Sequence, residues 1–577
     1  MRILKVPILI ILSITFASVQ GFDLMNSPES ISVNQYSPKK ELNAFGQPVK
    51  VIFPNGSEIC FFYDHIGRVK RCIMPDRSEF SYIYNRNRLM IKTFGSRTIK
   101  YEYDEFERLT KKTILQEDKV LIETRRYDQN GNLLTISENG KNAINFLYDR
   151  FGKRILETGP TGTIKYEYDE FGRLETRELE IKGGQKFQTN YSYGYSNYQI
   201  CIINSPAGNF YFNWSRATKK LHQIEYEYSD NNICKLYAVK TSFNLNKGIY
   251  AKSFARKGAQ PLEILQRCYN KSGQLIRNKL FDFIWNYNYD QYGRILSASG
   301  IKDKKFDFSY DESGNCVKYG DENFTYNDMW QISQPGYKYD SWGNLIESPT
   351  VRYEYDLKNR LIMFRKDGLT ISYDYDPMNQ LIARTIINSS GEQSKTNFLM
   401  SDMIEYARIT DGTATCHTFT PNIAEKIHKS LLDPLMLASS SSDGQNTYYI
   451  SDFDGSVVAA FSPSENGNIT KIISYSPYGR IVSNSGDKEN LIYGFKMMLN
   501  IGKGLYFNNG RIYSTELRSY LTRTPNIFFT ESPYSFERYN PISWKLKYDD
   551  NGFDADIKMY KKFEQELSDL EEVPADR

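Results

Sequence analysis

Polar and apolar residues alternate along most of this chain, and short turn sequences interrupt the alternation at regular intervals. Residues 164–168 (IKYEY) alternate in this way, which is the period of a β-strand with one buried face. Residues 169–173 (DEFGR) follow them. Asp can accept hydrogen bonds from backbone amides two residues on, and Gly tolerates the positive φ that closes a turn. The pattern therefore predicts a β-hairpin whose return strand begins at Arg173 and Leu174.

This unit is a repeat. Looser copies begin at Tyr84, Tyr103, Tyr127, Tyr148, Tyr269, Tyr310, Tyr326, Tyr339, Tyr355 and Tyr375. A lone hairpin is not stable in water, so neighbouring copies are expected to pair side by side into one continuous sheet. The three most regular copies give the predicted repeat-turn residues: Tyr63, Asp64, Gly67 and Arg68; Tyr168, Asp169, Gly172 and Arg173; Tyr289, Asp290, Gly293 and Arg294.

The copies resemble the YD-repeat, or Rhs, family, which includes bacterial Rhs toxins, the C subunits of insecticidal toxin complexes and the teneurins. The resemblance covers most of residues 50–550. It implies an all-β fold in which hairpins form a long sheet that spirals into a hollow shell or a partial shell. We expect this YD-repeat sheet over residues 50–384, after an N-terminal lead-in over residues 22–49. The degraded copies at 176–265 are expected to continue the sheet.

Beyond Arg384 the pattern changes, and residues 504–513 (GLYFNNGRIY) are similar to the Rhs-associated core, which we place at 385–552. In many family members this core is an aspartyl autoprotease. The resemblance puts its arginine at Arg511, its first aspartate at Thr524, and its second aspartate approximately at Asp549 or Asp550. A threonine hydroxyl neither ionises near neutral pH nor accepts a proton as a carboxylate does. We therefore expect no catalytic residue and no enzymatic activity.

The N-terminus has the form of a signal peptide over residues 1–21. Arg2 and Lys5 precede an apolar run over 6–16, and small residues follow up to Gly21. The run is too short to span a bilayer, and no later segment reaches about 18 apolar residues, so no membrane span is expected. The protein is predicted to be secreted or periplasmic. At the other end, residues 553–577 predict a short amphipathic helix.

Composition narrows the function classes. The chain has 577 residues, and its 45 Tyr are typical of a β-rich protein. Lys+Arg number 73 against 69 Asp+Glu, a balance that argues against a nucleic-acid partner. Of the seven cysteines, only Cys60 and Cys72 form a candidate disulfide. The four histidines do not fall into ligand spacings with the cysteines, and the Asp452-x-Asp454-Gly455 sequence lacks the later Glu of a calcium loop, so no metal or cofactor is expected.

These observations leave two function classes open. The first is a secreted, non-enzymatic scaffold for surface attachment or carbohydrate contact, since exposed aromatic rings can stack on sugars and the resemblance implies such binding. Its partner is a carbohydrate or a cell-surface protein. The second is an orphan or degenerate Rhs toxin-delivery shell that has lost its C-terminal effector. The sequence decides neither the ligand nor whether a half-length shell closes by dimerising.

Overall fold

The computed structural model describes residues 38–194, 199–214, 221–229, 232–239, 248–256, 260, 262–270, 272–300, 305–420, 435–462, 468–484, 491–525 and 532–535. The predicted signal peptide, Asp549, Asp550 and the C-terminal amphipathic tail lie outside these residues. Within them the fold is all-β, and the only helical element is a 3₁₀ turn at Phe495–Met497.

The first 27 strands form one antiparallel sheet, the outer sheet, in which each strand pairs with the next one along the chain. Its strands are Lys39–Leu42 (β1), Pro48–Ile52 (β2), Glu58–Tyr63 (β3), Val69–Ile73 (β4), Glu79–Asn85 (β5), Arg88–Phe94 (β6), Arg97–Tyr103 (β7), Leu109–Gln116 (β8), Lys119–Tyr127 (β9), Leu133–Glu138 (β10), Lys141–Tyr148 (β11), Arg154–Gly159 (β12), Gly162–Tyr168 (β13), Leu174–Ile181 (β14), Gln185–Tyr193 (β15), Ile200–Ser205 (β16), Gly208–Trp214 (β17), Leu221–Ser229 (β18), Asn232–Val239 (β19), Gly248–Arg256 (β20), Leu262–Tyr269 (β21), Leu275–Leu280 (β22), Phe283–Tyr289 (β23), Ile295–Ser299 (β24), Lys305–Tyr310 (β25), Cys316–Tyr319 (β26) and Glu322–Asn323 (β27).

Fourteen further strands form the middle sheet, and four form the inner sheet. The middle sheet consists of Lys338–Tyr339 (β28), Leu345–Ser348 (β29), Val351–Tyr355 (β30), Leu361–Lys366 (β31), Leu369–Tyr375 (β32), Leu381–Ile387 (β33), Gln393–Ser401 (β34), Ile404–Thr410 (β35), Thr413–Phe419 (β36), Met436–Ser441 (β37), Asn446–Ser451 (β38), Val457–Phe461 (β39), Ile469–Tyr475 (β40) and Ile481–Asn484 (β41). The inner sheet consists of Leu499–Gly502 (β42), Leu505–Asn508 (β43), Arg511–Ser514 (β44) and Ser519–Tyr520 (β45).

The predicted repeat turn is present with the bonds that its sequence suggests. The Asp169 Oδ1 accepts hydrogen bonds from the backbone amides of Phe171 and Arg173, at 3.0 and 2.8 Å. Its Oδ2 accepts one from Arg173 Nε at 2.6 Å, and Gly172 has a φ of +74°. One carboxylate therefore fixes both the turn and the arginine that follows it. The same bonds join Asp64 to Ile66 and Arg68, and Asp290 to Tyr292 and Arg294.

The Tyr and Arg of a copy bind the neighbouring copies. The Tyr168 hydroxyl donates to the Arg154 carbonyl, which opens the return strand of the preceding hairpin, at 2.9 Å. Arg173 Nη1 donates to the Gly194 carbonyl in the following turn at 3.1 Å. Each hairpin is thus fastened backward and forward at the same edge of the sheet. The backward bond recurs from Tyr63 to Pro48, Tyr84 to Val69, Tyr103 to Leu89, Tyr127 to Leu109, Tyr148 to Leu133, Tyr289 to Leu275 and Tyr310 to Ile295.

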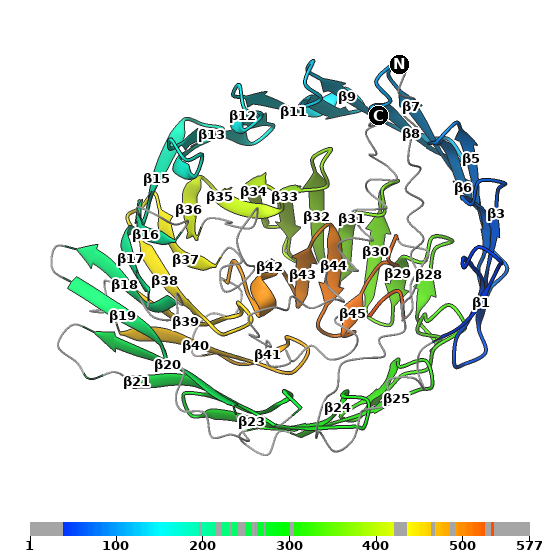
Figure 1. The fold of residues 1–577 in the computed structure, drawn as a ribbon. Coiled ribbons are helices and arrows are strands. Elements are labelled where there is room, and N and C mark those ends of the chain that lie inside the picture. The colour runs from blue at the N-terminus through cyan, green and yellow to red at the C-terminus, as the bar shows by residue number, and fades with distance from the viewer. Residues whose placement is uncertain are drawn as a thin grey trace, which may run out of the picture.

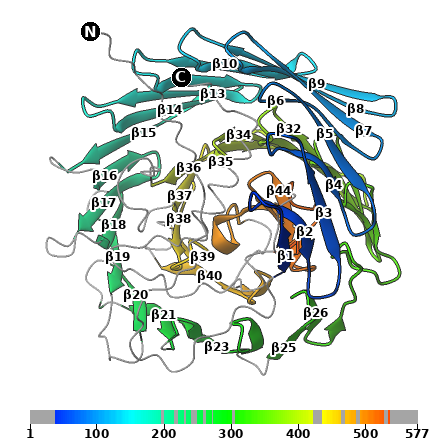
Figure 2. The same ribbon diagram turned by 45° about the vertical axis from the view of Figure 1, so that its right-hand side comes forward.

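The three sheets lie one inside another, and this confirms the expected spiral shell (Figures 1 and 2). The outer sheet curves around the middle sheet, and the inner sheet lies within the curve of the middle one (Figure 1). Side chains fill the space between outer and middle sheets, as where Ile164 and Leu179 pack with Leu399 and Ala407. The inner sheet in turn packs Leu505 and other apolar residues against the middle sheet. The core therefore consists of apolar seams between successive layers.

The structure contradicts one expectation from the sequence and shows where a second, a domain boundary, falls in the sheet. The disulfide between Cys60 and Cys72 is wrong, because Cys72 lies opposite Phe61 in the β3–β4 pair and is buried with it, whereas Cys60 points to the other face. The boundary expected between residues 384 and 385 falls inside β33, so the hydrogen-bonded sheet runs across it. The degraded stretch at 176–265 does contain strands, from β14 to β21.

Gly172→Val should lower the free energy of unfolding by about 1 kcal/mol or more, because a β-branched residue is strained at positive φ. The new Cβ would also clash with Lys153 Nζ, which donates to the Gly172 carbonyl. Chemical denaturation measures the change. The matched control is Gly159→Val in β12, where a Cβ meets nothing within 4 Å, and we expect its effect to stay within about 0.5 kcal/mol. Equal losses in the two variants would contradict the turn geometry.

Candidate functional site

The two described positions of the autoprotease-like core lie together at one backbone carbonyl. Arg511, in β44, donates from Nη2 to the carbonyls of Thr522 and Pro533, the latter at 3.0 Å. The backbone amide of Thr524 donates to the same Pro533 carbonyl at 2.9 Å. Arg511 and Thr524, the positions that the resemblance assigns to the core's arginine and first aspartate, are therefore neighbours, and their contacts fasten the chain after the inner sheet.

The segment around Thr524 is further anchored to the other two sheets. The Tyr534 hydroxyl donates to the Gly343 carbonyl at 2.7 Å, and burial raises the pKa of Tyr534 to about 12. The Arg523 guanidinium lies 5.1 Å from the ring centroid of Phe80 and 5.2 Å from that of Phe94, both in the outer sheet. This position is thus a junction of all three layers, which no local motif of the sequence indicates.

A buried charged group joins the outer and middle sheets at the Asp-x-Asp-Gly sequence. Arg267, in β21, lies 2.8 Å from Asp452 and 2.7 Å from Asp454. Lys252, in β20, donates from Nζ to the carbonyls of Ser451 at 2.7 Å and Asp452 at 3.1 Å. Burial lowers the pKa of Lys252 to about 8 and raises that of Asp452. The two carboxylates therefore face an arginine of the other sheet, and their chemistry is that of an ion-paired clamp.

A second clamp has the opposite arrangement, with the cations on the middle sheet. Lys358 lies 2.7 Å from Glu123 and 3.1 Å from Glu138, and Arg360 lies 2.7 Å from Glu138. Burial alone would raise the pKa of Glu123, but Lys358 and Arg125 lower it to about 2. Ion pairs this deeply buried are costly to break, because removing one partner leaves an uncompensated charge.

Within the middle sheet, Glu405, Arg408 and His417 form a third buried group. The Glu405 carboxylate lies 2.9 Å from His417 Nε2, and its two oxygens accept hydrogen bonds from Arg408 Nε and Nη2 at 2.5 and 2.7 Å. Burial raises the pKa of Glu405, yet Arg408 and His417 outweigh it and lower the pKa to about 2. Burial also lowers the pKa of His417. The His417 imidazole is therefore a hydrogen-bond partner of the buried Glu405 carboxylate and has a structural role.

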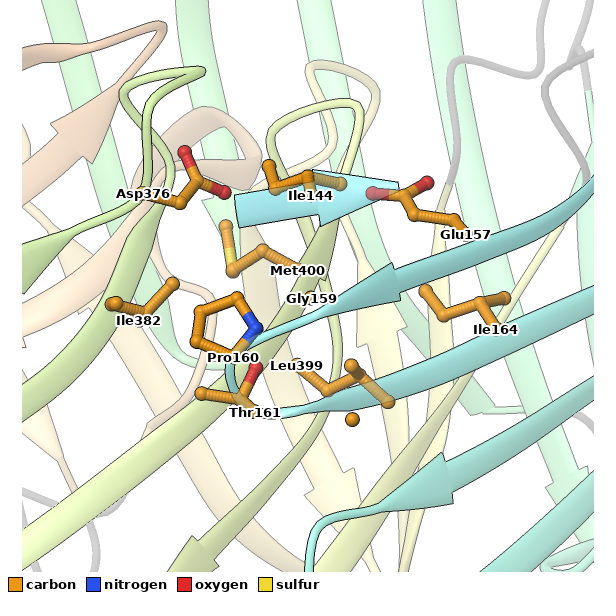
Figure 3. A pocket seen from close by; sticks show the side chains of 11 residues that line it. Ile144, Glu157, Gly159, Pro160, Thr161, Ile164, Asp376, Ile382, Leu399 and Met400 are labelled. Atoms are coloured by element: carbon orange, nitrogen blue, oxygen red, sulfur yellow. The ribbon is translucent and has the colours of Figure 1, made fainter. Parts of the chain in front are cut away.

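A small cavity lies between the outer and middle sheets and brings two further carboxyl groups to its wall (Figure 3). Glu157 accepts hydrogen bonds from Ser401 Oγ at 2.7 Å and Arg154 Nη1 at 2.6 Å. Burial raises the pKa of Glu157, and it raises that of Asp376 to about 6. The lining residues are Ile144, Glu157, Gly159, Pro160, Thr161, Gly162, Ile164, Asp376, Ile382, Leu399 and Met400.

Displaced carboxyl pKa values inside a cavity are typical of active sites. This cavity, however, offers about 10 Å³ to the centre of a water molecule, which is the space that one buried water needs. It is too small for a substrate, so the geometry favours a structural role for Glu157 and Asp376 where the two sheets meet. In the described ranges, no group of three or more His, Cys, Asp or Glu side chains could hold a metal ion. No helix of those ranges is long and apolar enough to cross a membrane.

Comparison with known proteins identifies a matching family model and several relatives. The protein-family model Teneurin YD-shell matches residues 215–552, more than half of the chain. Teneurin-m of Drosophila melanogaster is 21% identical over 547 residues, covering 87% of this chain and 17% of the relative. Teneurin-3 of Danio rerio is 25% identical over 508 residues, covering 83% and 17%. Double-stranded DNA deaminase toxin A of Burkholderia cenocepacia is 24% identical over 416 residues, covering 59% and 27%.

Among solved structures, TcdB2–TccC3 without its hypervariable C-terminal region aligns with 87% of this chain and 35% of its own, at 12% identity and a TM-score of 0.39. The chain thus spans only 17% of the length of either teneurin above. The family match covers β18 to the inner sheet and continues into residues beyond it. By that match, the chain belongs to the teneurin YD-shell family.

Proposed function

We propose that the protein is a secreted, non-enzymatic YD-shell scaffold that acts in surface attachment. The proposal rests on the buried ionisable groups, which form ion pairs across the sheets. These pairs are Arg267 with Asp452 and Asp454, and Lys358 with Glu123 and Glu138. Groups committed to such pairs hold layers together and are enclosed away from substrates. The N-terminal signal-peptide sequence supports secretion.

The autoprotease-like core supports a structural role as well. Thr524 supplies a hydroxyl in place of the first carboxylate of the resemblance, and its backbone amide shares the Pro533 carbonyl with Arg511. A pair of carboxylates is what would activate water in an aspartyl protease. With a threonine at this position, we propose that the core serves folding and closes the interior of the spiral.

The outward surface supports attachment. Among the described residues, the large apolar side chains that are exposed belong to the outer sheet and its turns, with the exception of Ile387 in the middle sheet. These side chains on the outer layer are accessible to a surface ligand. Carbohydrate contact stays part of the proposal, since aromatic rings such as Phe151 and Phe171 present a face on which a sugar can stack.

A toxin-delivery shell that has lost its effector is the second candidate. It is favoured by the 24% identity to a protein named Double-stranded DNA deaminase toxin A. A degenerate core at Thr524 suits both candidates. Binding to a surface ligand distinguishes them, because a relic shell has no need of one.

Thr524→Asp alone should leave the chain uncut, because Asp549 and Asp550 are displaced in sequence from the family's second aspartate. Intact-mass spectrometry of the purified mature wild type and of this variant, incubated over a range of pH values, measures cleavage. Both proteins should stay at full length. A wild-type protein that cuts itself near Gly552 would overturn the non-enzymatic proposal, and a cut only in the variant would show that Thr524 is the sole defect.

The mature protein should bind a surface ligand in a direct assay. We expect the labelled protein to retain signal on glycan arrays or on intact cells, whereas the same protein after heat unfolding loses it, because the binding surface depends on the folded outer sheet. Absence of binding to glycans, cells and lipid vesicles alike would contradict the attachment role and favour the relic shell.

A further inference from the structure

One edge of the outer sheet carries a row of apolar side chains at its turns. In an antiparallel sheet of consecutive hairpins, the turns β1–β2, β3–β4, β7–β8, β11–β12 and β13–β14 all lie at the same edge. Each has an apolar residue two positions after its Asp or Asn, and each of these side chains is between 55% and 89% exposed. We call this set the apolar edge: Phe45, Ile66, Phe106, Phe151 and Phe171.

The turn holds these residues outward. In each case the backbone amide of the apolar residue donates to the side-chain oxygen of the Asp or Asn two positions before it, at 2.8–3.1 Å. The turn itself does not require an apolar side chain there. The same bond forms with Asn130 in the β9–β10 turn and with Ser313 in the β25–β26 turn. Turn chemistry therefore does not account for the exposed apolar residue at this position in five turns of one edge.

Three of the rings each lie against an arginine guanidinium. Arg108, Arg150 and Arg173 lie 5.0, 4.7 and 4.9 Å from the centroids of Phe106, Phe151 and Phe171. Arg108 and Arg173 are ion-paired to the Asp of their own turns. Neighbouring turns, such as those of Phe151 and Phe171, are separated by two strand spacings, about 10 Å. The edge is thus a line of isolated apolar tips and not a continuous patch.

We propose that the apolar edge contacts a lipid bilayer, with the five side chains entering its interfacial region. This inference rests on the proposed attachment function and names a lipid surface as its partner. Binding at a membrane interface scales with the apolar area that enters the boundary between headgroups and acyl chains, and separate side chains at one edge each supply such area. A folded protein partner would need a well-packed core between the tips, and Ile66 has no ring to stack on a sugar.

The charges around the tips indicate which lipid. The same five turns carry seven acidic and five basic residues, so they form no basic patch that would attract anionic headgroups. The surface is therefore suited to zwitterionic headgroups, with little dependence on salt. The acidic residues are Asp64, Asp104, Glu105, Glu107, Asp149, Asp169 and Glu170, and the basic ones are Arg68, Arg108, Arg150, Lys153 and Arg173.

Sedimentation with phosphatidylcholine vesicles tests the proposal on the mature full-length protein. We expect the wild type to bind, and to change by no more than about twofold when phosphatidylserine is added or salt is raised. Phe106→Ser, Phe151→Ser and Phe171→Ser together should weaken binding by at least about a hundredfold, because each buried ring contributes about tenfold. The matched control is Val120→Ser with Leu262→Ser, two exposed apolar residues at the opposite edge, which should leave binding unchanged.

A second variant reports insertion directly. Phe151→Trp should keep binding, and the fluorescence of its added tryptophan should be quenched by brominated phosphatidylcholine, whereas Val120→Trp should show no such quenching. Binding that survives the triple substitution, absence of quenching at position 151, or binding only to anionic vesicles would overturn the lipid inference. If the wild type binds glycans or cell-surface proteins but no vesicles, the lipid inference fails while the attachment function stands. If it binds none of the three, both fail.

Discussion

The rest of the fold depends on the hydrogen bonds and the ion pair that the carboxylate of the turn aspartate accepts. At Asp169 it accepts hydrogen bonds from two backbone amides and from the Nε of the arginine in its own copy. That arginine also donates a hydrogen bond to the next turn. The tyrosine before it reaches back to the preceding hairpin. A single exposed ion pair contributes little, but here each pair sets the position of two neighbours. Register therefore passes from hairpin to hairpin, and a sheet of 27 strands stays in alignment.

A sheet of that length has one apolar face to cover, and the chain covers it with its own continuation. Apolar clusters such as Ile164 with Leu399 fill the seam between outer and middle sheets. Between these clusters lie buried charges such as Arg267 with Asp452. Apolar contacts are tolerant of sliding, whereas a buried charge is stable only beside its partner. We infer that the clamps fix how far the middle sheet is advanced relative to the outer one.

Short motifs in the sequence predict local structure, but they do not predict contacts between residues that are far apart in the chain. The hairpins and the turn at Asp169 and Gly172 follow from short motifs. The partners of Lys358 and Arg267 are more than 180 positions away in the chain, and their pairing depends on how the spiral winds, which no local pattern encodes. Cys60 and Cys72 show a related limit, since closeness on adjacent strands says nothing of the face to which each thiol points. The exposure of Phe151 and Phe171 is likewise not encoded by the turn motif, because polar residues occupy the same position in other turns.

We infer that the seam makes the outer and middle sheets one cooperative body. Native-state hydrogen exchange across increasing denaturant tests it most directly, by following backbone amides of β13 and β14 beside those of β34 and β35. We expect all of these amides to show one common free energy of opening, close to the free energy of global unfolding. The reason is that neither sheet keeps its core without the other. A distinctly lower opening free energy for β13 and β14, with β34 and β35 still protected, would show that the outer sheet opens independently and would contradict the account.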